Sequence, residues 1–170
     1  DSVVEGLTDK EDCPEASESP ISKIGDVWLL GRHRLVCGNS TCMDDVDKLM
    51  AGVQADMVFT DPPYNVDYEG YTEDKLKLAC DNMDNEDYAQ FLRDVFASCY
   101  LAVKKTASMY VCHPSLYQRE FQNALEANHF IVRNQIIWAK NHFAWGHGRY
   151  KFQHEPIFYC HQKDTADVWY

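Results

Sequence analysis

A double proline directly after a short apolar run is the strongest constraint that this sequence places on its fold. Residues 55–60 contain the apolar run Met57, Val58 and Phe59 and are short enough for a buried strand of a parallel sheet, and residues 61–64 (Asp-Pro-Pro-Tyr) follow at once. Proline has no N–H, fixes its own φ and steers the residue before it toward extended geometry. The chain must therefore leave the sheet at Asp61 in an extended, locally rigid conformation.

Residues 61–64 also carry groups that suit a planar ligand with an amino group. An open α/β sheet binds its ligands just beyond the carboxyl ends of its strands. At that place the Asp61 carboxylate and a neighbouring backbone carbonyl can act as paired acceptors, and Tyr64 adds a flat aromatic face. A nucleobase is such a ligand. The competing explanation is a proline turn with a chance Asp and Tyr.

The remaining patterns alternate strands with helices. Strand patterns occupy residues 26–30, 35–37, 55–60, 107–112, 130–138 and 156–160, and helical patterns occupy 42–50, 85–99 and 116–127. Ser40 or Thr41 is the expected N-cap of the first helix and Asn85 that of the second, whereas residues 65–85 show no period and predict a loop. This order predicts an α/β fold whose sheet is mostly parallel, covered on both faces, with an antiparallel strand pair at the C-terminal end.

Charge is unevenly distributed along the 170 residues, whose formal net charge is -11. Residues 1–20 hold seven acids and one base, a net -6, and predict an acidic disordered linker or tail that precedes a folded region at 21–170. Residues 131–163 hold five basic side chains and one acid, a net +4, which suits either a polyanion such as DNA or a merely solvated loop. No apolar run reaches the roughly 20 residues of a membrane-spanning helix, so we expect no membrane partner.

The cysteines and histidines predict no covalent or metal framework. The seven cysteines are odd in number and form no Cys-x-x-Cys, which favours reduced thiols packed as small apolar residues in a cytoplasmic protein. The histidines at 142, 147, 154 and 161 match no helix face, so we predict no metal site. Because the chain begins at Asp1 rather than Met, we expect it to be a piece of a longer protein.

Three stretches together resemble one enzyme family. The sequence Asp61-Pro62-Pro63-Tyr64-Asn65, following residues 56–60, resembles the catalytic motif of S-adenosylmethionine-dependent DNA amino-methyltransferases, which modify adenine N6 or cytosine N4. Residues 31–40 resemble the strand and turn that precede this motif in the permuted class called β, and residues 137–140, 148–150 and 154–159 resemble its later strand pair. The resemblance extends over residues 24–163 and implies a Rossmann-like methyltransferase sheet.

The resemblance also implies roles for individual residues. Asp61, Pro62, Pro63 and Tyr64 would be catalytic: the Asp61 carboxylate and the Pro62 carbonyl would accept the N–H groups of the target amine. The target base would be flipped out of double-stranded DNA and stacked on Tyr64. Residues expected near S-adenosyl-L-methionine are Asn39, where the family commonly has Asp, and Asp61; those expected near the substrate are Tyr64, Asn65, Lys140, His154 and Glu155.

Two further expectations follow from the same resemblance. Adenine is favoured over cytosine because the motif begins with Asp rather than Ser. In the permuted class a recognition region and a glycine-rich cofactor strand follow the segment seen here, and residues 65–170 contain no counterpart, so we expect this chain alone to be inactive. The alternatives are a non-catalytic or truncated piece that only binds nucleic acid or a partner, and a cytosine-N4 enzyme. A homodimer is a further expectation.

Overall fold

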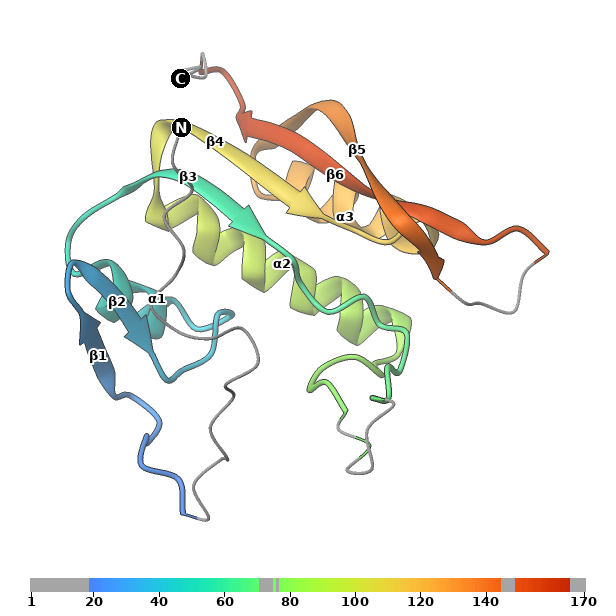
Figure 1. The fold of residues 1–170 in the computed structure, drawn as a ribbon. Helices are drawn as coiled ribbons and strands as arrows, with labels where there is room; N and C mark the ends of the chain where they lie inside the picture. Colours follow the sequence, from blue (N-terminus) through green and yellow to red (C-terminus); the bar gives the residue numbers. More distant parts are fainter. Residues whose placement is uncertain (1–18, 71–74, 76, 145–148, 166–170) are drawn as a thin grey trace, which may run out of the picture.

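The computed structural model describes residues 19–70, 75, 77–144 and 149–165 (Figure 1). The elements in chain order are β1 (Val27–Leu30), β2 (His33–Val36), α1 (Met43–Met50), β3 (Ala55–Thr60), α2 (Asn85–Ala102), β4 (Val103–Cys112), a 3-10 turn (Ser115–Tyr117), α3 (Gln118–Ala127), β5 (Phe130–Ala144) and β6 (Phe152–Gln162). The acidic tail predicted at residues 1–20 lies almost wholly outside the described residues.

Four strands form one sheet in the spatial order β3-β4-β6-β5. β3 and β4 are parallel, whereas β6 is antiparallel to both of its neighbours, β4 and β5. Three of the four strands therefore run in one direction and only β6 is reversed. This arrangement confirms the predicted α/β class, with a mostly parallel sheet and an antiparallel pair at the C-terminal end. β1 and β2 form a separate antiparallel hairpin.

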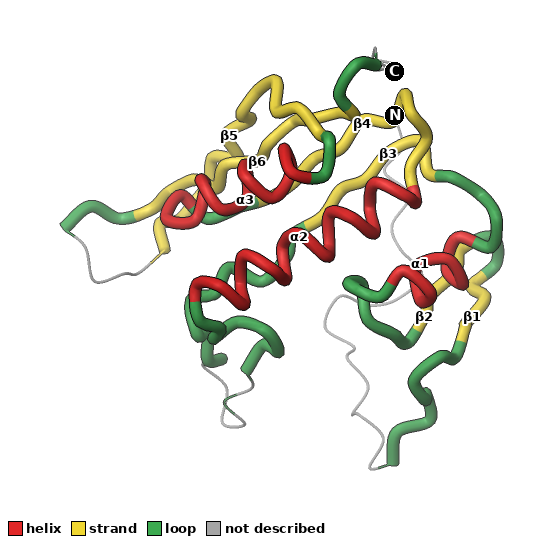
Figure 2. The backbone as a smooth tube through the Cα atoms, turned by 180° about the vertical axis from the view of Figure 1, so that it is seen from behind, coloured by secondary structure: helices red, strands yellow, loops and turns green. Residues whose placement is uncertain are grey.

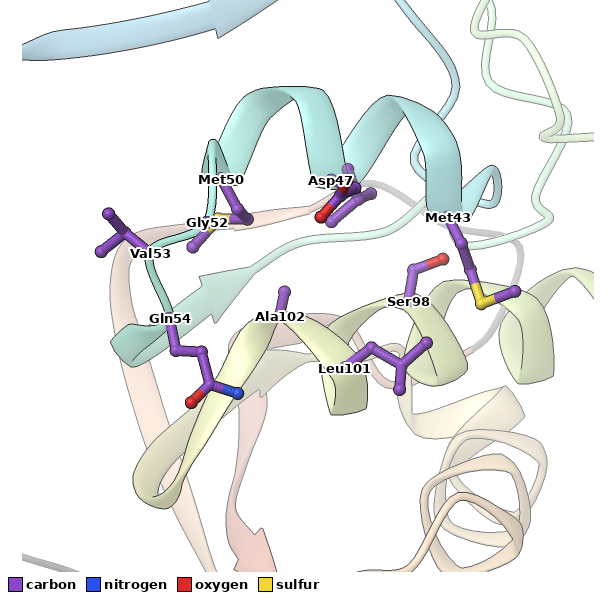
Figure 3. Close-up of a pocket in the computed structure, with 10 residues that line it drawn as sticks. Met43, Asp47, Met50, Gly52, Val53, Gln54, Ser98, Leu101 and Ala102 are labelled. Carbon is purple, nitrogen blue, oxygen red and sulfur yellow. The ribbon is translucent and has the colours of Figure 1, made fainter.

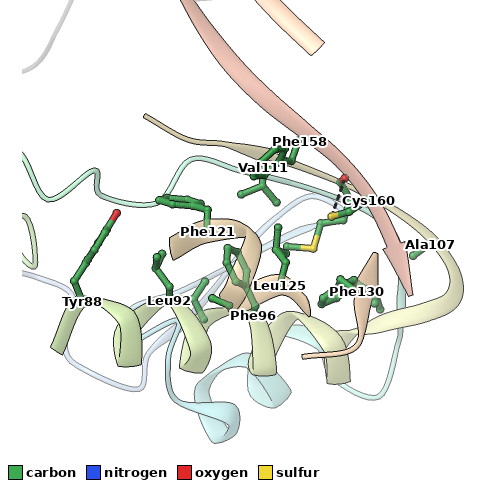
Figure 4. Close-up of a cluster of buried hydrophobic side chains, with 14 residues drawn as sticks. Tyr88, Leu92, Phe96, Ala107, Val111, Phe121, Leu125, Phe130, Phe158 and Cys160 are labelled. Carbon is green, nitrogen blue, oxygen red and sulfur yellow. Dashed lines mark hydrogen bonds between the residues drawn. The ribbon is translucent and has the colours of Figure 1, made fainter. Parts of the chain in front are cut away.

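Helices α2 and α3 lie on one face of this sheet (Figures 1 and 2). Their apolar sides and alternate residues of the strands form the core, because successive strand residues point to opposite faces (Figure 4). The largest buried members of the core are Tyr88, Leu92, Phe96, Met109, Phe121 and Leu125.

The sequence predicts helices on both faces of the sheet, whereas in the described structure α2 and α3 lie on one face. On the opposite face, the register partners Phe59, Tyr110 and Tyr159 form an aromatic row across three strands, with successive ring centroids 6.4 and 5.4 Å apart. Phe59 is 62% exposed, and Met57, two residues before it on β3, is 56% exposed. Within the described residues, the β3 end of this face therefore stays open.

The helix N-termini differ from those that the sequence predicts. The N-cap of α2 is Asp84 rather than Asn85, and the Asp84 carboxylate accepts hydrogen bonds from two first-turn amides, each at 2.9 Å. The N-cap of α1 is Cys42, whose side chain makes no capping bond, rather than Ser40 or Thr41. Both predictions were wrong by one or two residues, since several residues with capping side chains stand next to each other at each terminus.

The two C-terminal strands are longer than their sequence pattern predicts. β5 continues to Ala144 and β6 begins at Phe152, whereas the sequence pattern predicts strands only over 130–138 and 156–160; residues 145–148 lie outside the described residues. The two strands pair antiparallel from Phe130 with Gln162 to Ala144 with Phe152, with register shifts between Val132 and Asn134 and between Ala139 and Ala144. The polar residues in this region show no strand pattern in the sequence. They form strand because the partner strand satisfies their backbone N–H and C=O groups.

Six cysteines lie in the described part of the chain, and all six are free. Cys112 and Cys160 are buried as predicted, whereas Cys80 is exposed and the others are intermediate. Across these residues, no helix combines the length and apolar character that crossing a bilayer requires.

Candidate functional site

The sheet brings most of the predicted site residues to one edge. The carboxyl ends of β3, β4 and β5 meet there with the beginning of the reversed strand β6. The register shows this directly, since Thr60 lies opposite Val111, and Trp138 lies opposite Glu155. The loop that carries Asp61 and Tyr64 therefore leaves the sheet beside the segment that carries Glu155.

Within the double-proline loop, the residues differ in their exposure. Asp61 is exposed, Pro62 is buried, and Tyr64 is partly buried against the hydrophobic core. The Tyr64 hydroxyl oxygen is itself buried and has no hydrogen-bond partner. Burial, then the closeness of the hydroxyl to the Asp61 carboxylate as an acceptor and as a charge, and then the charge of Glu155 raise the pKa of Tyr64 well above its ordinary value. Tyr64 is therefore a neutral phenol whose hydroxyl lies in the field of two carboxylates.

Cys112, the last residue of β4, is a neighbour of this loop that the sequence did not reveal. Burial raises the pKa of its thiol to about 11, and the charges of Asp61 and Glu155 act in the same direction, while Lys140 opposes them. The thiol is thus neutral and sits among the charged groups of the site. The sequence holds one signal for it, since Cys112 ends the strand pattern at 107–112 just as Thr60 ends the pattern at 55–60.

Lys140 and Glu155 form a close ion pair across β5 and β6. The Lys140 ammonium also lies 4.7 Å from the centroid of the Trp138 ring, a cation–π contact. Both partners are partly buried, so solvent screens their attraction less than it screens a fully exposed pair. His154, the residue before Glu155, is exposed and lies opposite Ala139.

Asn65 directs its side chain toward the protein. Its Oδ1 accepts a hydrogen bond from the Met83 amide at 2.6 Å, and its Nδ2 donates to the Met83 carbonyl at 3.0 Å. Asn65 has a positive φ of 57°, a conformation that Asn tolerates better than most residues. The amide group that the resemblance placed near the substrate is thus used to hold the loop.

Asp81 is a second anchor of the same loop, and sequence reasoning missed it. Asp81 is only 2% exposed, and its carboxylate accepts hydrogen bonds from the amides of Val66 at 3.3 Å and Tyr68 at 2.7 Å. The Asp67 amide also donates to the Asp81 carbonyl, at 2.7 Å. The segment that follows Tyr64 is consequently fixed to residues 81–83.

Asn39 does not join the other predicted site residues. It lies after the β1–β2 hairpin, which both views show apart from the four-stranded sheet (Figures 1 and 2). Its Oδ1 accepts from the Thr41 amide at 3.0 Å and from the Thr41 hydroxyl at 2.9 Å. The backbone amide of Asn39 donates a hydrogen bond to the Asp45 carboxylate. This bond, and then Lys48, lower the pKa of the Asp45 carboxyl. The Asn39 side chain thus organises the turn into α1.

A cavity of about 300 Å³ lies elsewhere, between α1 and the C-terminal half of α2 (Figure 3). Met43, Met50 and Leu101 give it apolar walls, and none of the predicted site residues lines it. No group of three or more His, Cys, Asp or Glu residues in the described ranges is arranged to hold a metal ion.

Comparison with known proteins identifies the family. The sequence model of the DNA methylase family, the N6 and N4 methyltransferases, matches residues 55–169. The chain therefore belongs to the DNA methylase family. None of the curated proteins to which the sequence was compared matches it.

The chain is also similar to solved structures. It is similar to M1.HpyAVI in a complex with SAM, with 19% identity and a TM-score of 0.50, over 75% of this chain and 53% of that one. It is also similar to TTHA0409 from Thermus thermophilus, described as a putative DNA modification methylase, with 17% identity and a TM-score of 0.49, over 74% and 55% of the two chains. The first likeness supports the fold. The chain spans about half the length of these structures.

Proposed function

We propose that this chain is the amine-binding half of a DNA methyltransferase that transfers a methyl group from S-adenosyl-L-methionine to the exocyclic amine of adenine. One observation carries the proposal: Asp61 and Tyr64 stand at the carboxyl end of β3, within electrostatic reach of Glu155, in a member of the DNA methylase family. A carboxylate beside an aromatic ring, at the ligand-binding edge of an α/β sheet, suits a nucleobase amine.

The chain's own residues would make the amine reactive. The lone pair of an exocyclic amine is delocalised into the base, which makes the nitrogen a poor nucleophile. If the Asp61 carboxylate and the Pro62 carbonyl each accept one N–H, they favour a more tetrahedral nitrogen whose lone pair can attack. Acceptors fixed in advance stabilise that geometry in the transition state more than in the ground state.

The DNA would approach along the β5–β6 pair. Its described tip carries Arg149, Lys151 and Tyr150, of which Tyr150 is 93% exposed, and it extends from the edge where Asp61 lies (Figure 1). Basic side chains attract the phosphate backbone, and exposed aromatic rings stack on bases. A base inside a duplex cannot reach Asp61, so it must be flipped out, and Tyr64 would then stack on it.

The described residues do not by themselves fit the cofactor. The Asn39 side-chain oxygen is taken by Thr41, and β3 pairs only with β4, so in the described structure nothing covers its outer edge. The similar structure M1.HpyAVI is a complex with SAM, which supports the identity of the cofactor but not a complete pocket in this chain. We therefore propose that this chain alone neither binds S-adenosyl-L-methionine nor methylates DNA.

The test of the function uses a longer protein that contains this chain. With labelled S-adenosyl-L-methionine and DNA, Asp61→Asn should lower methyl transfer at least about a hundredfold, since a positioned acceptor in the transition state is lost. The matched control is Asp56→Asn, because Asp56 lies on the same strand, exposed, and pairs with Lys104 at 2.6 Å. The control should keep its activity.

The product separates the alternatives. Hydrolysis of the modified DNA should release N6-methyladenine, whereas N4-methylcytosine would show that the chain belongs to a cytosine enzyme. Wild-type protein that binds DNA without any transfer would contradict the enzymatic proposal and favour a module that only binds nucleic acid.

Cofactor binding by the chain alone is tested by calorimetric titration. We expect no saturable heat. One site per chain with micromolar affinity, about -8 kcal/mol, would contradict the proposal that the pocket is incomplete. We also propose that the isolated chain self-associates through β3, where Met57 and Phe59 are exposed, and sedimentation that shows only monomer at high concentration would refute this.

A further inference from the structure

Tyr88 connects the first turn of α2 to the double-proline loop. Its side chain is completely buried, and its hydroxyl donates a hydrogen bond of 2.7 Å to the carbonyl oxygen of Pro63. The ring is held by its neighbours, with centroids 5.1 Å from Tyr117 and 6.4 Å from Phe121. Figure 4 shows the hydroxyl pointing away from the helix axis at the end of the core cluster.

This hydrogen bond constrains the carbonyls of the loop. Pro62 and Pro63 have no N–H, so the backbone there can be anchored only through its carbonyl groups. Successive carbonyls of an extended chain point in different directions, as successive side chains do. When Tyr88 holds the Pro63 carbonyl toward α2, an extended backbone would turn the Pro62 carbonyl the other way, to the side from which a ligand approaches.

We propose that Tyr88 is a positioning residue of the amine-binding loop, which holds the Pro63 carbonyl so that the Pro62 carbonyl and the Asp61 carboxylate face the target amine. The inference rests on the proposed function. Tyr88 would contact neither the DNA nor the cofactor and would act only through the loop.

Two other features of the structure agree with this role. The segment after Tyr64 is held by Asn65 and Asp81, and Tyr88 extends this anchoring to the proline part of the same loop. Burial, and then the charge of Asp81, raise the pKa of Tyr88 well above its ordinary value, so its hydroxyl remains a donor. In the sequence Tyr88 is only one apolar position of an amphipathic helix.

The test compares Tyr88→Phe with Tyr117→Phe. The first removes only the hydroxyl and keeps the ring in the core, and the second removes a hydroxyl from a ring in the same cluster. In this chain, the amides of Val66, Asp67 and Tyr68 are hydrogen-bonded to Asp81, so their exchange with solvent reports the order of the loop. Tyr88→Phe should speed their exchange roughly five- to tenfold, as loss of one hydrogen bond predicts, and Tyr117→Phe should not.

The second measurement uses the longer protein. Tyr88→Phe should lower kcat about tenfold and leave the KM for DNA unchanged, because the carbonyl would be misdirected without loss of DNA contacts. Equal exchange and equal kcat in Tyr88→Phe and wild type would overturn the inference. If the wild-type protein transfers no methyl group, the proposed function fails, while faster loop exchange in Tyr88→Phe would still establish that Tyr88 positions the loop.

Discussion

The imidazole of His113 stacks on the ring of Phe158, with the two centroids 3.9 Å apart and the planes inclined by 28°. His113 follows β4 directly, is completely buried, and its amide donates to the Pro156 carbonyl at 3.1 Å. Its Nδ1 lies 3.3 Å from the Pro114 carbonyl, whereas its buried Nε2 has no partner. Burial lowers the pKa of this histidine, so it is held neutral in the folded protein.

Protonation of His113 should make stability depend on pH. Because the folded pKa is below the unfolded value of about 6.5, the unfolded chain binds the proton first as the pH falls. The contribution of His113 to stability is therefore complete above about pH 6.5 and decreases below it. In His113→Phe, which keeps an aromatic ring against Phe158, the free energy of unfolding should lose this part of its pH dependence. Urea unfolding between about pH 5 and pH 8 measures it, and a difference between the two proteins that is constant over this range would refute the prediction.

The two substitutions of Tyr64 should separate its ring from its hydroxyl. Because the hydroxyl is buried without a partner, Tyr64→Phe should leave the stability unchanged or raise it by up to about 1 kcal/mol. Tyr64→Ala removes a ring that packs on the core and should cost about 2 kcal/mol. In the methyl-transfer assay with the longer protein, the Phe variant should keep far more activity than the Ala variant. An equal loss in both would assign the hydroxyl a direct role.

The cysteines should differ sharply in their reactivity. With a pKa of about 11, roughly one Cys112 thiol in a thousand is ionised at about pH 8, and Cys160, with a pKa of about 12, is less ionised still. Alkylation of the folded chain, followed by peptide mass spectrometry, should label the exposed Cys80 first and leave Cys112 and Cys160 unlabelled. Under denaturing conditions all seven cysteines should react. Rapid labelling of Cys112 in the folded chain would show that the edge of the sheet opens readily.

Deletion of residues 1–20 should leave the fold intact. This segment has a net charge of -6 and no period, so it contributes little apolar surface to the core. Calorimetry of the two chains should show thermal midpoints that agree within about 2 °C. A midpoint lowered by several degrees would correspond to about 1 kcal/mol or more and would show that the segment packs on the domain.

The sequence alone determined the features that depend on neighbours along the chain. The apolar run of β3 and the double proline after it predicted both the end of the strand and the place of Asp61, because proline restricts the backbone whatever surrounds it. The helical periods likewise predicted α2 and α3, and the order of the elements predicted the class of fold. These signals are local, with a range of a few residues.

Only the tertiary structure decided which distant residues meet. Placing β6 between β4 and β5 brings Glu155 beside both Lys140 and the Asp61 loop, and nothing in the spacing of these residues predicts that order. In the sequence Tyr88 is one position of a helix, yet its hydroxyl holds the Pro63 carbonyl. Asp81 is an acidic residue in a predicted loop, yet its carboxylate binds the amides of residues 66 and 68. Asn39 is the reverse case. The sequence predicts its side chain near the cofactor, but in the structure its Oδ1 accepts two hydrogen bonds from Thr41. Buried polar groups must find hydrogen-bond partners, and the packed fold determines which partners are within reach.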